Sequence, residues 1–172
     1  MQFSIEFQVD HLVRALEAVR LEIATPQQML GSLGESLLRV NQQRHNQGLA
    51  PDGSKWKPLS PMTVGKSRLL YGHGDMLGSF NYQVQGDELK LSFSDRKAVW
   101  HHFGTGTFGP RGTPYTISPK KAKALAFGGM FRRRVTHPGI PARLLTGFPA
   151  SDQLLTIEVI DDHLKAVLNR VR

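Results

Sequence analysis

Hydrophobic and polar residues alternate strictly at the start of the chain. Phe3, Ile5, Phe7 and Val9 are separated by Gln, Ser and Glu residues. A period of two is typical of a strand with one buried face. The chain is therefore predicted to open with a strand over residues 3–9.

Two helices are predicted to follow. Asp10 is placed to cap the first helix, and Thr25 with Pro26 matches an N-cap followed by the first position of the second, which should run to about Arg44. The apolar positions of the first helix recur at helical spacing and are Leu12, Leu16, Val19 and Ile23. The predicted core face of the second helix consists of Met29, Leu33, Leu37 and Val40.

Glycines interrupt the second helical pattern at Gly31 and Gly34. Each should weaken the helix by about 1 kcal/mol relative to Ala, which indicates either close packing against a neighbour or a soft helix. Residues 50–61 contain three prolines and a Pro-Asp-Gly turn, so they are predicted to form a loop anchored by Trp56 and Leu59.

The middle of the chain predicts two short helices, at 63–70 and 74–79, and then a β-hairpin. Residues 80–84 and 89–93 both alternate, and Gly86 with Asp87 supplies the turn between them. A short amphipathic helix is expected over residues 96–103, ending at Gly104. A turn-rich loop follows over residues 104–114.

A second hairpin is predicted farther along. Residues 125–127 and 130–132 flank Gly128 and Gly129, a pair suited to positive φ, and a short strand should precede them at 115–117. Residues 137–141 should break the second arm. Ser151 is placed to cap a last helix with a broad apolar stripe. The economical interpretation is one α+β domain over residues 1–172: a small, mostly antiparallel sheet, two N-terminal helices, one C-terminal helix, and a long basic hairpin extension at 105–140.

Charge is concentrated in one segment. Residues 98–151 hold eight cations and no acid, whereas the whole chain has 22 Lys+Arg against 14 Asp+Glu, so the net charge of +8 resides in this segment. A merely solubilising hairpin is one explanation. The others are contact with DNA or with an acidic protein surface. The cations expected to meet such a partner are Lys120, Lys121, Lys123, Arg132, Arg133 and Arg134.

Catalytic and cofactor sites find little support. The glycines of residues 104–109 are followed by Pro110 and Pro114 rather than a helix, which disfavours a phosphate loop. The chain has no Cys, its adjacent His101 and His102 diverge on a helix, and no Gly-x-Ser-x-Gly elbow occurs. We therefore expect no enzyme, no catalytic residue, no bound metal and no cofactor; a hydrolase is the weakest alternative.

Three segments, taken in order, resemble the phage virion morphogenesis family, the tail-completion proteins of Mu-like phages. Residues 51–60 are similar to the family's PDG-x-x-W-x-PL-S signature, with Trp56, Pro58 and Leu59 at its fixed positions. Residues 73–80 are similar to x-x-G-x-L-x-x-S-I, and a Trp-His-x-Phe-Gly turn follows at 100–104. Residues 139–147 are close to IPARPFLG, and contain Pro141, Arg143 and Gly147.

The resemblance implies a structural virion protein that completes the tail or joins it to the head. It implies a homo-oligomeric ring, with six subunits as the expected number, that contacts the tail tube and the neck or connector proteins. The expected location is the head–tail junction of the virion, after assembly in the host cytoplasm, with no membrane partner. Leu144, Leu145 and Thr146 replace the usual Pro-Phe-Leu, and the basic insertion at 108–136 is larger than the minimal family pattern.

Two residue-level expectations complete this hypothesis. Arg143 is expected to be a structural anchor whose guanidinium fork satisfies carbonyls or a carboxylate. The basic hairpin is expected to reach the next subunit or an acidic neighbour. The alternative is a basic DNA-binding protein that uses residues 120–134 and contacts duplex nonspecifically.

Overall fold

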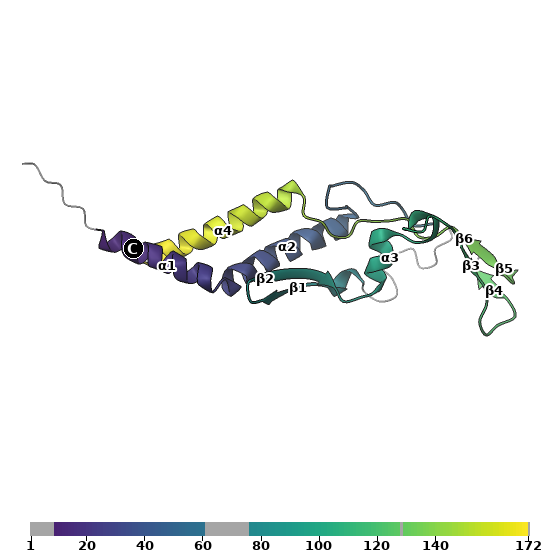
Figure 1. Ribbon diagram of the computed structural model, residues 1–172. Helices are drawn as coiled ribbons and strands as arrows, with labels where there is room; N and C mark the ends of the chain where they lie inside the picture. The colour runs from purple at the N-terminus through teal and green to yellow at the C-terminus, as the bar shows by residue number, and fades with distance from the viewer. Residues whose placement is uncertain (1–8, 61–75, 128, 172) are drawn as a thin grey trace, which may run out of the picture. The chain divides into compact units, whose positions relative to one another are not determined.

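The computed structural model describes residues 9–60, 76–127 and 129–171. Except for Val9, the strand predicted over residues 3–9 lies outside these ranges, as do the helix predicted at 63–70 and the start of the one predicted at 74–79. In the described ranges the order of elements is α1 (Asp10–Ala24), α2 (Gln27–Gln47), β1 (Phe80–Gln85), β2 (Glu88–Phe93), α3 (Lys97–Phe103), β3 (Tyr115–Ile117), β4 (Leu125–Phe127), β5 (Met130–Arg132), β6 (Val135–His137) and α4 (Ala150–Arg170) (Figure 1). Short 3₁₀ turns lie at Leu77–Ser79 and Gly106–Phe108.

This arrangement confirms the α+β class. The strands described here form three two-stranded sheets, β1 with β2, β3 with β6, and β4 with β5. Both predicted hairpins are present. The pairing of β3 with β6 was missed, because the sequence pattern gave no sign that residues 135–137 return to a strand 18 residues earlier; the register joins Tyr115 to His137 and Ile117 to Val135.

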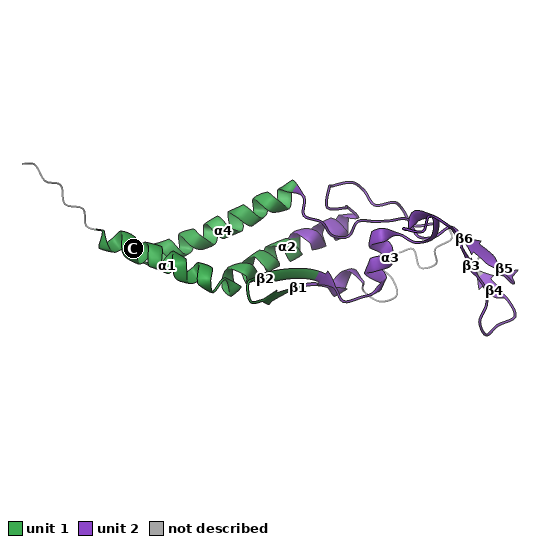
Figure 2. Ribbon diagram, viewed as in Figure 1, with its two compact units in different colours: residues 1–39, 82–91, 150–172 green, residues 40–81, 92–149 purple. Residues whose placement is uncertain are grey.

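The chain divides into two compact units (Figure 2). Unit 1 comprises residues 1–39, 82–91 and 150–172, and unit 2 comprises residues 40–81 and 92–149. Helix α2 and the β1–β2 hairpin each contribute residues to both units. The single domain over residues 1–172, with its insertion at 105–140, stays a prediction.

Helices α1 and α4 pack against each other in unit 1. Glu22 Oε1 on α1 lies 2.6 Å from His163 Nε2 on α4. The predicted caps of both helices are wrong: α1 has Val9 at its N-cap position, without a side-chain cap, and α4 begins at Ala150, so Ser151 is already its second residue. Asp10 is therefore the first residue of α1, where its charge still faces the positive end of the helix dipole.

The apolar stripe of α1 is not a core face. Helix α1 has no buried residue, and Leu12, Leu16 and Ile23 are each more than half exposed. Helix α2 matches its prediction better, because Leu33 and Leu37 are buried. The stripe of α2 continues at spacings of four residues through Asn41 to His45, both buried, rather than through Val40.

Gly34 marks a close approach between α2 and β1. A Cβ atom built at Gly34 would lie 2.4 Å from Cδ2 of Tyr82, whereas one at Gly31 meets nothing within 4 Å. One of the two sequence-based explanations, close packing against a neighbour, therefore applies to Gly34. Gly31 has open space around it.

The two glycines provide a matched pair of substitutions. Gly31→Ala is expected to raise the free energy of unfolding by up to about 1 kcal/mol, because Ala is the better helix former. Gly34→Ala is expected to lower it by about 1–3 kcal/mol, because displacing the Tyr82 ring outweighs the same propensity gain. Urea unfolding followed by circular dichroism would measure both. Equal effects of the two substitutions would contradict the close approach.

The hydrophobic core of unit 2 joins segments far apart in sequence. Buried residues from the loop after α2, the 3₁₀ turn before β1, α3 and the segment before α4 form one cluster: Ala50, Trp56, Met76, Leu77, Ala98 and Leu145. Phe93 of β2 packs against this cluster. The core therefore unites all three segments that carry the family-like motifs.

Candidate functional site

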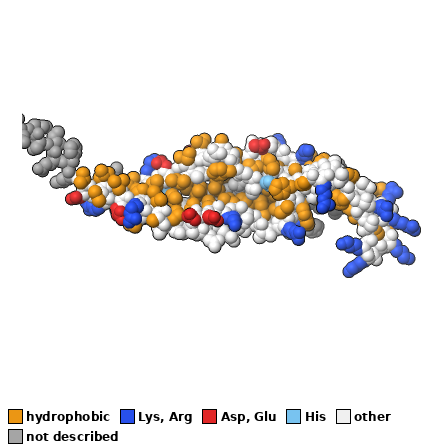
Figure 3. Space-filling model, viewed as in Figure 1, with side chains coloured by type: hydrophobic (Ala, Val, Ile, Leu, Met, Phe, Trp, Pro, Cys, Tyr) orange, Lys and Arg blue, Asp and Glu red, His pale blue; other side chains and the backbone are white. Residues whose placement is uncertain are grey.

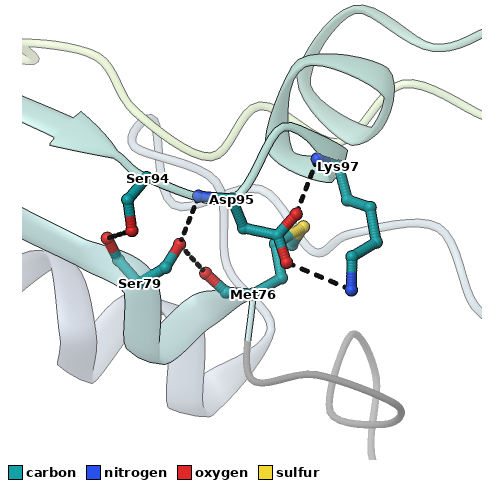
Figure 4. Close-up of polar contacts among 5 residues, drawn as sticks. All are labelled: Met76, Ser79, Ser94, Asp95 and Lys97. Carbon is teal, nitrogen blue, oxygen red and sulfur yellow. Dashed lines mark hydrogen bonds and ion pairs between the residues drawn. The ribbon is translucent and has the colours of Figure 1, made fainter.

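Ser79 ties the start of β1 to the approach to α3. Its hydroxyl donates to the Met76 carbonyl at 2.7 Å and accepts from the backbone N–H of Asp95 at 3.1 Å (Figure 4). The Ser94 backbone N–H donates to the Ser79 carbonyl at 3.2 Å. The serine of the second motif therefore holds the two ends of the β1–β2 hairpin together.

Asp95 organises the first turn of α3. Its Oδ1 accepts from the Lys97 backbone N–H at 2.9 Å, and its Oδ2 pairs with Lys97 Nζ at 3.1 Å (Figure 4). The backbone hydrogen bond from Lys97 is the main cause that lowers the pKa of Asp95. The carboxylate thus satisfies a donor that the start of a helix leaves unpaired.

The Arg143 guanidinium lies on the Pro-rich loop. Its Nε donates to the Lys57 carbonyl at 2.8 Å and its Nη2 to the Pro58 carbonyl at 2.9 Å, while Nη1 lies 3.4 Å from the Pro141 carbonyl. The Arg143 backbone N–H donates to the His101 carbonyl at 2.7 Å. Arg143 is only 4% exposed, and burial lowers its pKa. This one side chain joins the first motif to the third.

Two further side chains hold the segment after Arg143. The indole Nε1 of Trp56 donates to the Leu144 carbonyl at 2.9 Å. The Leu145 carbonyl lies 2.7 Å from His45 Nε2, and the Leu145 N–H donates to His102 Nδ1 at 3.2 Å. We call Arg143, Trp56, His45, His102 and Leu145 the corner. Its hydrogen bonds fix the backbone of residues 143–145 on both edges.

Two further residues of the family-like motifs are Leu59 and Gly147. Leu59 is half-buried, and a Cβ atom built at Gly147 would lie 3.1 Å from Cβ and Cγ of Pro51. Gly147 therefore lies against the turn of the first motif, which the Asp52 carboxylate stabilises by accepting from the Ser54 N–H at 2.9 Å.

His45 is the corner residue that sequence reasoning missed. The second helix was predicted to end at about Arg44, but α2 continues to Gln47, and His45 is buried in it, with its ring centroid 5.7 Å from Trp56, 5.4 Å from Phe80 and 5.7 Å from Phe93. The available signal was its spacing: it lies on the same stripe of α2 as Leu33 and Leu37. His137 was assigned to a loop but belongs to β6, where its Nδ1 accepts from the Gly139 N–H.

The corner is expected to lose stability in mild acid. Burial is the first cause that lowers the pKa of His45, His101 and His102, so all three are held neutral in the folded protein. The unfolded chain binds protons first as the pH falls below about 6.5, and stability is then lost as the pH passes through the lowered folded values.

Urea midpoints measured at pH 7.5, 6 and 5 would test this expectation. The midpoint should fall with pH, and the fall should be smaller in a His45→Gln variant than in the wild type. Asp52 and Asp95 also have lowered pKa values, but carboxyl groups titrate nearer pH 4, so they contribute at more acidic pH. A midpoint that stays constant from pH 7.5 to 5 would contradict the argument.

The backbone segments 105–107 and 138–140 lie side by side at the two ends of the basic insertion, and we call them the neck. Thr105 donates its N–H to the Ile140 carbonyl at 2.9 Å, Thr107 donates to the Pro138 carbonyl at 2.6 Å, and the Ile140 N–H donates to Thr105 Oγ1 at 2.9 Å. A Cβ atom built at Gly139, where φ is +114°, would lie 1.8 Å from the Thr105 carbonyl oxygen. No side chain fits there, so the glycine is required by the contact.

We call residues 110–137, which follow this neck, the arm. The β3–β6 pair lies nearest the neck in sequence, and the β4–β5 hairpin follows with Leu125 opposite Arg132. All six predicted contact cations are exposed, and Figure 3 shows Lys and Arg side chains gathered around this hairpin. Across the described ranges, no carboxylate pairs with any of the six. The arm therefore presents unneutralised positive charge.

An open hollow lies beside the root of the arm. Its volume is about 580 Å³, and its lining includes Trp100, Arg111 and Tyr115 together with the glycines of residues 104–109. The Tyr115 ring also stacks on His137, with centroids 5.3 Å apart. The Gly-rich stretch once considered as a phosphate loop thus forms a 3₁₀ turn and part of this hollow rather than opening an α-helix.

Metal ligation finds no candidate among the residues that the structure describes, where His, Asp and Glu side chains nowhere gather in a group of three that could hold an ion. In the same ranges, each helix is too short or too polar to span a bilayer. The corner is a hydrogen-bonded and largely buried part of unit 2, whereas the arm presents a charged, partly aromatic surface suited to binding.

Comparison with known protein families gives one match. The model of the phage virion morphogenesis family matches residues 7–165, which include the corner, the neck and the arm. Neither the curated proteins nor the solved structures yield a match to this chain.

Proposed function

The chain belongs to the phage virion morphogenesis family, and from this premise we propose that it completes the tail as a subunit of a ring at the head–tail junction. Family membership gives the coarser role, a structural part in the morphogenesis of a bacteriophage virion. The finer role is supported by the arm, since an exposed basic hairpin carried on a rigid corner suits binding between subunits. The expected ring has six copies and contacts the tail tube and the neck or connector proteins.

The arm is the observation that carries this proposal. Six exposed cations that pair with no carboxylate of the described residues repel one another, so they favour an oligomer or an acidic neighbour that neutralises them. Phe131 is 76% exposed on β5, which adds an aromatic anchor of the kind that dominates binding energy at protein interfaces.

Light scattering and negative-stain imaging of the purified protein, together with immunolabelling of phage particles, would test the proposal. Rings in solution and label at the head–tail junction are expected. A variant with the six predicted contact cations replaced by Gln should assemble and join particles less well. The control, with exposed Arg14, Arg39, Lys55 and Lys90 replaced by Gln, should behave as the wild type. A strict monomer that never joins particles would contradict the proposal.

Binding of passing DNA is the second candidate, because the same unpaired cations can neutralise phosphates. If the six cations contact six phosphates, affinity should fall about 10³-fold between 50 and 200 mM salt. Arg132→Ala, Arg133→Ala and Arg134→Ala together should abolish binding to a fluorescent duplex. Absence of binding at 50 mM salt would exclude this role.

A further inference from the structure

The two compact units carry opposite charge. Unit 1 has 7 Lys+Arg against 11 Asp+Glu, a net −4, whereas unit 2 has 15 against 3, a net +12. Two copies that met through the same unit would bring like charges together, which costs free energy and slows association. Contact between unit 2 of one copy and unit 1 of another is electrostatically favoured.

Within unit 1, helix α4 concentrates both negative charge and exposed apolar surface. Its residues 150–164 contain four acids, one of them the buried Asp152, and no Lys or Arg. Leu154 and Ile157 are 62% and 64% exposed on this helix. Glu158 and Asp161 follow Leu154 by four and seven residues, so they share its face. We call Leu154, Ile157, Glu158 and Asp161 the α4 outer face.

The arm offers the complementary features. On β5, the exposed Met130 and Phe131 are followed directly by Arg132 and then by Arg133 and Arg134. An exposed aromatic ring on the same hairpin as three guanidinium groups matches a helix face that combines aliphatic side chains with carboxylates, since the ring buries apolar area while Arg forms bidentate hydrogen bonds with acids.

Helix α1 is a poorer acceptor, although Leu12, Leu16 and Ile23 leave its stripe exposed. Its Glu17 already pairs with Arg20, and its Glu22 lies 2.6 Å from His163 Nε2, so Asp10 is the one carboxylate of α1 without such a contact in the described residues. On α4, Asp161 pairs with Lys165, whereas both Glu158 and Asp162 have no ion pair within the described residues. Charge complementarity therefore selects α4.

We propose that the α4 outer face is the docking surface for the basic arm of a second copy of this chain. This inference rests on the proposed ring-forming function and specifies which surfaces meet. Because the arm and the α4 outer face are different surfaces, the contact is head-to-tail. Repetition of a head-to-tail contact closes into a ring when the rotation between subunits permits it, and otherwise extends as a filament.

The absence of Cys allows a direct test, because introduced thiols are the only ones present. Phe131→Cys and Ile157→Cys are made in separate proteins, one of them carrying a mass tag. Mixing them with a short bis-maleimide crosslinker is expected to give mainly the tagged–untagged pair. The control pairs Phe131→Cys with Gln83→Cys, an exposed residue of β1 in unit 1, and should give at least fivefold less product.

Charge reversal provides the second measurement. Glu158→Lys with Asp161→Lys in the Ile157→Cys protein should reduce the crosslink at least fivefold, and Arg132→Glu with Arg133→Glu in the Phe131→Cys protein should do the same. Combining the two reversed proteins should restore much of the yield, which nonspecific contact would not do.

The outcomes separate this inference from the proposed function. Docking on α4 would be overturned if Phe131→Cys proteins crosslinked mainly to each other, and Ile157→Cys proteins likewise. It would also be overturned if the mixed crosslink formed in the same yield as with the Gln83→Cys control. If the wild type is found at the head–tail junction in that case, the tail-completion role stands while the docking surface is wrong. If the crosslink forms but the protein never enters particles, the tail-completion role is wrong.

Discussion

Replacing Trp56 with Ala is expected to lower the free energy of unfolding by about 3–5 kcal/mol, the usual cost of removing a buried aromatic side chain. Trp56 is 7% exposed, belongs to the main core cluster of unit 2 and donates to the Leu144 carbonyl. The substitution therefore creates a cavity and leaves that carbonyl without its indole donor. Urea unfolding monitored by circular dichroism would measure the loss.

Trp56→Phe separates the two contributions. Phe keeps most of the apolar volume but cannot donate to Leu144, so a loss of about 1–2 kcal/mol is expected, less than half that of the Ala variant. Exposed Trp100 provides the matched control, since Trp100→Ala should change the free energy of unfolding by less than about 1 kcal/mol. Equal losses at Trp56 and Trp100 would contradict the placement of Trp56 in the core.

Replacing Arg143 with Ala is expected to cost about 3 kcal/mol of folding free energy. The substitution removes two short charge-assisted hydrogen bonds, to the carbonyls of Lys57 and Pro58, each contributing about 1.5–3 kcal/mol before the Arg desolvation cost is subtracted. The Pro-rich loop should loosen as well. Faster hydrogen exchange at residues 55–59 would report this loosening beside the lower urea midpoint.

Arg143→Lys should recover less than half of the loss, because a single ammonium group cannot reproduce the guanidinium fork. Arg132→Ala is the control: it removes the same side chain from an exposed position on the arm and should change stability by no more than about 0.5 kcal/mol. If Arg143→Lys were as stable as the wild type, the fork geometry would not be what holds the loop.

Local periodicity predicted the elements well where neighbours in sequence decide the outcome. The face of α2 with Leu33 and Leu37, the two hairpins and the strand at 115–117 all follow from short-range patterns and turn residues. The same periodicity was misleading at α1, because an apolar stripe indicates a surface that avoids water but does not say whether this chain or another one covers it.

Long-range contacts explain most of what sequence reasoning missed. The return of β6 to β3, the burial of His45 and the burial of Asp152 at 1% exposure all depend on segments distant in the chain. Asp152 lies in the first turn of α4, where the helix dipole favours an exposed acid, and nothing in the local sequence indicates that this carboxylate is buried.

The candidate site, too, could be predicted from the sequence only in part. The residues of the corner could be chosen from the motif resemblance, but the carbonyls that Arg143 and Trp56 reach became known only from the fold. The cations of the arm were evident from composition alone, since no acid interrupts residues 98–151. Composition could not reveal the opposite charge of the two units, because their segments are interleaved along the chain.

The neck between Thr105 and Ile140 has a consequence for how the family can diverge. Its backbone hydrogen bonds, and the glycine that their closeness requires, hold the two ends of the arm together without help from any arm side chain. Insertions, deletions and charge changes in the arm should therefore not disturb the hydrogen bonds of the corner. Changes in the sequence of the arm can therefore alter what the arm binds while the fold of the corner stays the same.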